Sequence, residues 1–107
     1  DSIVIHYKNQ ITWKDSIGNY GYAKCFGLIV TNNLKEIIDY SMYCNYFDQD
    51  KDQFTHKYIR NTDLEGGVGS SLLVAGSGKW NKYQGSTCNY AIDYLNLSLF
   101  IIEKCKR

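Results

Sequence analysis

Long hydrophobic runs, proline and an excess of one charge are all missing from this 107-residue sequence. The longest apolar stretch, residues 95–102, contains Asn96 and Ser98 and is much shorter than the roughly 20 residues that a membrane helix needs. We therefore expect no membrane span. Twelve basic residues against eleven acidic ones give a net charge of +1, with no basic stripe that could follow a phosphate backbone. We therefore expect no nucleic-acid partner.

A complete calcium loop is also missing. Asp48, Asp50 and Asp52 begin like an EF-hand, but the sixth position is Gln53 where glycine belongs, and the twelfth is Ile59 where the bidentate glutamate belongs. The segment is therefore interpreted as a solvated hairpin loop, with weak cation binding left open. We assign no metal ligands and no cofactor.

Histidine is scarce, and no nucleophile, base and orienting group stand together in the sequence. His6 and His56 are the only histidines and neither has a recognisable catalytic partner in sequence, so no catalytic residue is assigned and an enzyme is the less favoured reading. His56 shares strand parity with Phe54 and Tyr58 and could face a protein interior. Inside a small barrel it could also meet Glu103, despite their separation in sequence.

The four cysteines contain no CxxC pair of the kind that zinc or thioredoxin chemistry uses. Their even number and wide spacing favour two disulfides and an oxidising compartment, with buried free thiols as the alternative. Three connectivities are possible; we favour the one that links consecutive strands of a hairpin in each case. These pairs are Cys25–Cys44 and Cys88–Cys105. The opening residues, Asp1 to Ile5, look like a mature strand after removal of a signal peptide, so we expect a periplasmic or secreted protein.

Alternation with a period of two runs through most of the chain and predicts strands. Around residues 20–30, large apolar side chains hold one parity, while Gly21, Ala23, Cys25 and Gly27 hold the other, as a tightly curved sheet requires. A second face carries Ile38, Tyr40, Met42, Cys44 and Tyr46. Only residues 33–40 also suit a helix. With no proline and turn signals at short intervals, the chain predicts one all-β domain over residues 1–107, an antiparallel barrel of about seven or eight strands, or alternatively a sandwich.

Tyrosine is abundant, with ten residues, more than one small core can hide with every hydroxyl satisfied. Some of these side chains should therefore reach water or a barrel mouth, where aromatic rings bind apolar ligands or protein partners; cross-strand packing is the alternative. The candidate ligand-binding residues are Tyr40, His56, Tyr58, Trp80 and Tyr83.

Two stretches carry a resemblance to a known group of barrels. Residues 44–54 resemble a C-x-x-x-D-x-D-G-D hairpin, and residues 75–85 resemble a G-[TS]-G-x-[FWY]-x-G-x-x-G turn. Both patterns are similar to those of small exported bacterial proteins of the allene-oxide-cyclase-like, lipocalin-like superfamily, and the second also to the turn of dirigent proteins. Lys51 and Lys82 stand where that group has glycine, so each turn must hold a left-handed lysine or take another geometry.

In the second motif, Gly76 and Gly78 are expected to take positive φ, and Trp80 is expected to fold back as a buried plug. The resemblance implies a non-enzymatic binding protein. Two alternatives remain: a lipid-modifying enzyme resembling allene oxide cyclase, and a protein inhibitor or immunity-type barrel. An open apolar interior would favour a ligand carrier or cyclase, and a filled interior would favour surface recognition.

Overall fold

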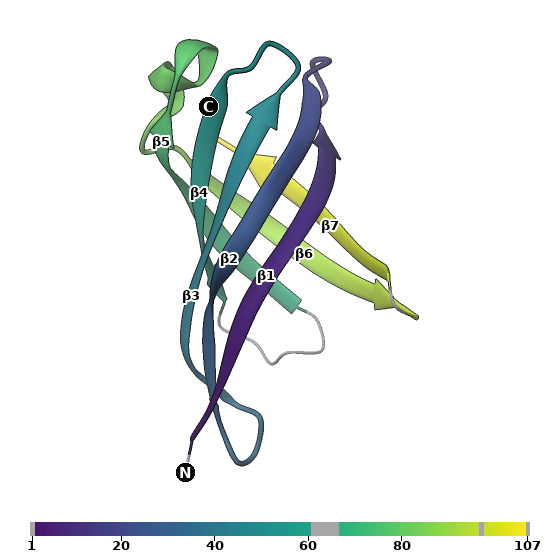
Figure 1. Ribbon diagram of the computed structural model, residues 1–107, viewed down its shortest axis with the longest axis vertical. Coiled ribbons are helices and arrows are strands. Elements are labelled where there is room, and N and C mark those ends of the chain that lie inside the picture. Colours follow the sequence, from purple (N-terminus) through teal and green to yellow (C-terminus); the bar gives the residue numbers. More distant parts are fainter. Residues whose placement is uncertain (1, 61–66, 97, 107) are drawn as a thin grey trace.

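The computed structural model describes residues 2–60, 67–96 and 98–106 (Figure 1). They form seven strands and one short 3₁₀ helix, so the predicted all-β class is confirmed. The elements are β1 (Ser2–Lys14), β2 (Tyr20–Asn32), β3 (Ile37–Asp48), β4 (Gln53–Arg60), β5 (Gly67–Gly76), η1 (Gly78–Tyr83), β6 (Thr87–Leu95) and β7 (Ser98–Cys105).

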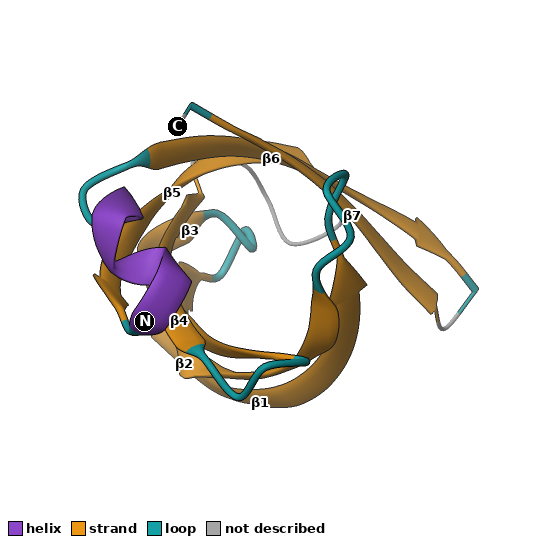
Figure 2. Ribbon diagram, turned by 90° about the horizontal axis from the view of Figure 1, so that it is seen from above, coloured by secondary structure: helices purple, strands orange, loops and turns teal. Residues whose placement is uncertain are grey.

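All seven strands belong to a single antiparallel sheet in which each strand pairs with its neighbours in sequence. Seen from above, the sheet curls round until β6 and β7 lie across the interior from β1 and β2 (Figure 2). This single curled sheet matches the predicted barrel and not the alternative, a sandwich of two sheets. Within the described residues, β1 and β7 are the two edges and are not paired, so the barrel is open along one side.

Strand β2 shows why the sheet curves so strongly. Its small residues, Ala23 and Cys25 among them, point inward and are buried, whereas Tyr22 and Phe26 point outward and are exposed. Gly21 belongs to the inward set, and a side chain there would collide with the backbone carbonyl of Phe47 on β3. Small inward residues on β2 thus let β3 approach closely, which leaves the larger residues of the same strand on the convex surface.

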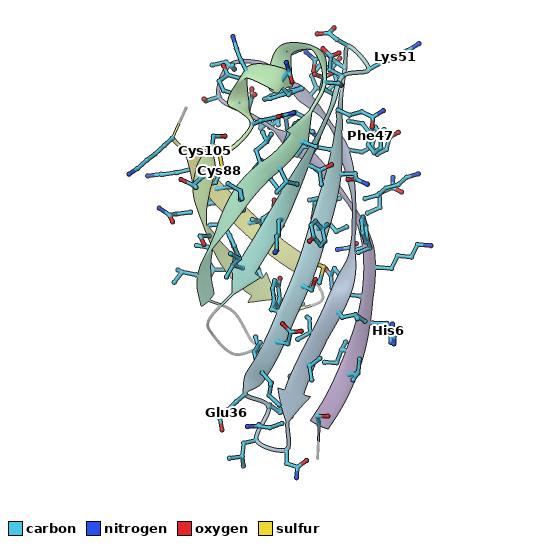
Figure 3. All side chains as sticks on the ribbon, turned by 90° about the vertical axis from the view of Figure 1, so that its left-hand side faces the viewer. His6, Glu36, Phe47, Lys51, Cys88 and Cys105 are labelled. Atoms are coloured by element: carbon cyan, nitrogen blue, oxygen red, sulfur yellow. A yellow bond between two sulfur atoms is a disulfide. The ribbon has the colours of Figure 1, made fainter. Side chains whose placement is uncertain are left out.

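The core consists mainly of aromatic side chains at one end and a mixed set towards the middle of the barrel. Trp13, Tyr46, Phe54 and Trp80 form an edge-to-face and stacked cluster, with ring centroids 4.3–6.1 Å apart. In Figure 3, by contrast, His6 and Phe47 project from the outer surface. The buried hydrophobic residues are Ala23, Cys25, Ile29, Met42, Cys44, Tyr46, Phe54, Tyr58, Leu73, Trp80, Cys88 and Tyr90.

Both predicted disulfides are present, and each joins residues that face one another across paired strands. Cys25–Cys44 links β2 to β3, and Cys88–Cys105 links β6 to β7. No described cysteine is free. The two bonds fit an extracellular or otherwise oxidising compartment. In the described ranges, no helix has the length and apolar character needed to cross a membrane.

Local geometry departs from the sequence-based expectation at two places. The 33–40 segment is a turn followed by the start of β3, not a helix, and Ile38 points outward because a register shift opposite Val30 and Thr31 leaves it as an extra residue. The second motif contains the 3₁₀ helix η1. Gly78 has a φ of 55°, as expected, but Gly76 does not have positive φ; it is constrained because a side chain there would meet the backbone of Trp80.

Candidate functional site

A partly open cavity of about 250 Å³ lies inside the barrel. Inward residues of β1, β2 and β3 form one wall, and residues of β6 and β7 form the opposite wall. Its surface is mostly apolar. The lining residues are Ile5, Tyr7, Asn9, Ile11, Cys25, Ile29, Tyr40, Met42, Cys44, Tyr46, Tyr58, Tyr90, Ile92 and Ile101.

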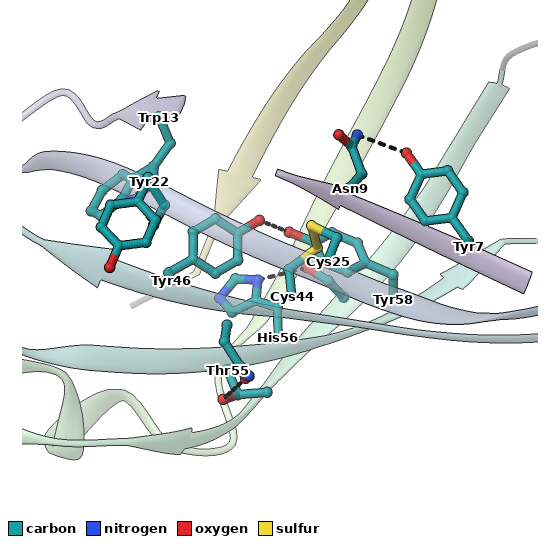
Figure 4. Close-up of a disulfide and its surroundings, with 12 residues drawn as sticks. Tyr7, Asn9, Trp13, Tyr22, Cys25, Cys44, Tyr46, Thr55, His56 and Tyr58 are labelled. Atoms are coloured by element: carbon teal, nitrogen blue, oxygen red, sulfur yellow. Dashed lines mark hydrogen bonds between the residues drawn. A yellow bond between two sulfur atoms is a disulfide. The ribbon is translucent and has the colours of Figure 1, made fainter. Parts of the chain in front are cut away.

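Polar groups in this cavity are few and are mainly tyrosine hydroxyls. Asn9 Nδ2 donates to the Tyr7 hydroxyl at 2.9 Å, and the Tyr90 hydroxyl donates to the carbonyl of Ile59 at 2.9 Å. The Tyr46 and Tyr58 hydroxyls are hydrogen-bonded to each other (Figure 4). The arrangement is the usual one for a small-molecule site, an apolar surface with a few placed polar atoms.

Next to this tyrosine pair lies a buried polar contact between strands far apart in sequence. His56 on β4 places its Nδ1 atom 3.0 Å from Glu103 Oε1 on β7 and 3.3 Å from Ser71 Oγ on β5. His56 is only 1% exposed. The sequence-based hypothesis that His56 faces the interior and meets Glu103 is therefore confirmed. Strand alternation could suggest the inward position of each residue, but only the curl of the sheet brings β7 across to β4.

The tyrosine pair is held in its neutral form by its surroundings. Burial raises the pKa of Tyr46 well above the usual value for tyrosine, and the nearby charge of Glu103 raises it further. Burial also raises the pKa of Tyr58, and Tyr46 and Glu103 add to this effect. Tyrosine is already protonated at neutral pH, and the raised pKa values keep both hydroxyls protonated at alkaline pH as well, so they serve as hydrogen-bonding groups.

The cluster around His56 lacks the arrangement of a serine triad and offers few ligands for a metal ion. Ser71 and Glu103 both contact Nδ1 of His56, so the imidazole does not bridge them as the base of a serine triad would. His56, Cys88 and Glu103 bring potential metal-ligand atoms within 4.8 Å of one another. Because Cys88 is committed to a disulfide, two potential ligands remain, where protein zinc sites use three or four.

The five candidate ligand-binding residues divide between two regions. Tyr40 and Tyr58 line the cavity, and His56 lies buried beside it. Trp80, at 1% exposure, is the predicted plug at the end of the barrel, and Tyr83 lies half-buried against it with ring centroids 6.1 Å apart. Neither Trp80 nor Tyr83 lines the cavity.

Sequence reasoning missed several cavity residues, notably Tyr7, Asn9, Tyr90 and the Cys25–Cys44 disulfide as part of the wall. The signal for Tyr7 and Asn9 was present, since both share parity with Ile5 and Ile11 on β1. That signal could not show whether the enclosed space was filled.

Comparisons of the chain with protein-family models, curated proteins and solved structures found no match.

Proposed function

We propose that this protein binds a small, largely apolar ligand inside its barrel and does so without catalysing a reaction, in the periplasm or as a secreted protein. The cavity of about 250 Å³ is the observation that carries the proposal. Drug-sized ligands usually occupy about 300–1,000 Å³, so the ligand class is one of smaller molecules. The similarity to exported lipocalin-like barrels remains a prediction that points the same way.

The construction of the cavity wall supports a preformed binding site. The Cys25–Cys44 disulfide, which is part of the lining, fixes β2 to β3, and the sheet hydrogen bonds fix both strands to their neighbours. A wall held in one shape reduces the entropy that must be lost when a ligand binds. A cyclase would use the same cavity, but no acid–base pair of the described residues lines it.

The test is to fill the cavity from one wall and measure binding of a neutral probe. Ile29 lines the cavity, so Ile29→Phe should weaken 2-phenylethanol binding about tenfold or more, as loss of about 1.4 kcal/mol would. The matched control is Leu28→Phe, the exposed neighbour on the same strand, which should bind like the parent. Isothermal titration calorimetry provides the affinities. If both variants weaken 2-phenylethanol binding equally, or if neither variant weakens it, a site inside the barrel is contradicted.

A second candidate function is recognition of a protein partner at the outer face of β2 and β3. Two aromatic pairs stack there, each with one exposed and one half-buried ring: Tyr22 with Phe47, at a centroid distance of 4.9 Å, and Phe26 with Tyr43, at 6.0 Å. Exposed aromatic clusters commonly mark contact surfaces. Because Ile29→Phe leaves this face unchanged, a partner whose binding survives that variant would assign the function to the outer surface.

A further inference from the structure

Glu103 does not line the cavity, but it lies opposite the lining residue Tyr90 in the β6–β7 pairing and contacts His56, which packs beside Tyr46 and Tyr58. Building on the proposed function, we propose that the ligand carries a protonated amine, held at the end of the cavity formed by Tyr46, Tyr58 and the Glu103 carboxylate behind them.

The first argument is the charge of the site. No lysine or arginine is among the described residues that line the cavity, so nothing there would neutralise an acidic ligand. The ionisable group that acts on both Tyr46 and Tyr58 is the carboxylate of Glu103. Nδ1 of His56 lies 3.0 Å from Oε1 of that carboxylate, so the contact leaves Oε2 on the other side of the group. The cavity end therefore favours a cation over an anion.

The second argument is an unused acceptor. Oε2 of Glu103 is buried and makes no hydrogen bond of ordinary geometry within the described part of the chain, and the Tyr58 hydroxyl lies close to the same carboxylate. A buried acceptor of this kind is costly, and it is costlier on a charged group than on a neutral one. An ammonium group has three N–H donors and can satisfy both this oxygen and a tyrosine hydroxyl.

The third argument is the aromatic lining. Five tyrosines surround the space: Tyr7, Tyr40, Tyr46, Tyr58 and Tyr90. Ring faces attract cations through their quadrupole, and this attraction is strongest where water is excluded. The same rings provide the apolar contact that the body of the ligand needs. An alkylamine on an aromatic or aliphatic body thus matches both parts of the cavity.

The experiment compares three probes of similar size that differ in charge: 2-phenylethylamine, 2-phenylethanol and 3-phenylpropionate. Alkyl ammonium groups resemble lysine, with a pKa of about 10.4, so the amine is protonated at neutral pH. Calorimetric titration of the wild-type protein should show the amine binding about tenfold more tightly than the alcohol, and the acid most weakly.

Glu103→Gln tests the origin of the preference, because it removes the charge and keeps the shape. The ratio of amine to alcohol affinity should fall towards one in this variant. Asp93→Asn is the matched control: it neutralises an exposed carboxylate on β6 that is not part of the lining, and should leave the ratio unchanged. The wild-type series requires no variant, so the proposal stays testable even if Glu103→Gln does not fold.

The outcomes separate the two proposals. Equal affinities for the three probes, tightest binding of the acid, or an amine preference that survives in folded Glu103→Gln would overturn the amine inference and leave cavity binding intact. Failure of all three probes to bind would overturn the proposed function and the amine inference together.

Discussion

Asp48 makes the densest set of polar contacts at the plugged end of the barrel. Its Oδ1 atom accepts the backbone amides of Asp50 and Asp52 at 2.8 and 2.9 Å, and its Oδ2 atom accepts the Trp80 indole N–H at 2.8 Å. Lys79 Nζ lies 3.2 Å from the same Oδ2. The aspartate-rich loop and the glycine-rich turn are thus parts of one structure, and the cation that the aspartates face is a lysine.

The neighbouring turn geometry follows from these contacts. Lys51 adopts a φ of 66°, so the first turn holds a left-handed lysine in place of glycine. Lys82 lies within the 3₁₀ helix η1 and does not have positive φ, so the second turn has another geometry. Gly78 has a φ of 55°, which favours glycine, and a side chain there would meet the Asp52 carboxylate and displace it.

Asp48→Asn should lower the free energy of unfolding by about 2 kcal/mol at neutral pH, since hydrogen bonds to a charged group are lost. Burial acts to raise the pKa of Asp48, but the hydrogen bonds from Trp80, from the Asp52 and Asp50 amides and from Lys79 outweigh it, so the pKa is lowered from 3.8. The charged form therefore stabilises the folded state above that value, and this advantage is lost as the pH falls through the folded pKa.

Urea unfolding of the wild type and Asp48→Asn over a pH series provides the check. The difference in stability between them should shrink as the pH is lowered below 3.8. Asp39→Asn, an exposed carboxylate variant on β3, should show little difference at any pH. A difference for Asp48→Asn that stays constant down to the most acidic buffer would contradict the proposed role of the charge.

Trp80→Ala should destabilise the fold by roughly 3–5 kcal/mol, the range for removing a large buried aromatic side chain. The variant also removes the indole donor to Asp48, so the loss comes from both packing and hydrogen bonding. Leu34→Ala, at a side chain that is 79% exposed, is the control and should unfold close to the parent midpoint. An unchanged denaturant midpoint for Trp80→Ala would show that the indole is not an anchor.

At the scale of the elements, each disulfide closes a hairpin that the sheet has already aligned. The sequence separations are 19 residues for Cys25–Cys44 and 17 for Cys88–Cys105, so loop entropy assigns each a similar stabilisation of about 3 kcal/mol. Their positions differ, because only the first lines the cavity.

Replacing each pair by alanines should therefore separate stability from binding. Both double variants should lose comparable stability in thermal unfolding. Cys25→Ala with Cys44→Ala should cause the larger loss of 2-phenylethanol affinity at a temperature where all proteins are folded, because it removes part of the wall. A larger affinity loss for the Cys88–Cys105 pair would contradict the placement of the site.

The strands and their pairing could be predicted largely from local patterns. Alternation locates β1 to β4, and the expected hairpins led to the cysteine pairing that was favoured among three. Which face of each strand points inward was harder to predict. On β2, large apolar residues occupy one face and small residues the other, and hydrophobicity alone does not decide which face is buried. Curvature decides it, and curvature depends on how closely Gly21 lets Phe47 approach. The short helix η1 was not predicted, since its turns are fixed by Trp80 packing.

At the scale of the whole molecule, the cavity could not be predicted from any local pattern. Its lining comes from six strands, β1 to β4, β6 and β7, and its volume depends on how far the sheet curls. Tyrosine abundance indicated that some of these side chains reach water, and Tyr20 and Tyr22 are exposed. The His56–Glu103 contact was foreseen as a possibility, but its position beside the cavity depends on the same curl.

The unpaired seam between β1 and β7 gives the barrel the shape of a split ring. Both disulfides lie within hairpins, so neither of these covalent bonds crosses the seam, and in the described residues no sheet ladder crosses it either. Widening the gap therefore breaks no strand pairing among the described residues, but it strains the His56–Glu103 contact, which joins β7 to β4 across the interior. A guest could enter and leave sideways as the ring flexes, and its residence time would then be set by the stiffness of the ring as well as by the affinity of the cavity.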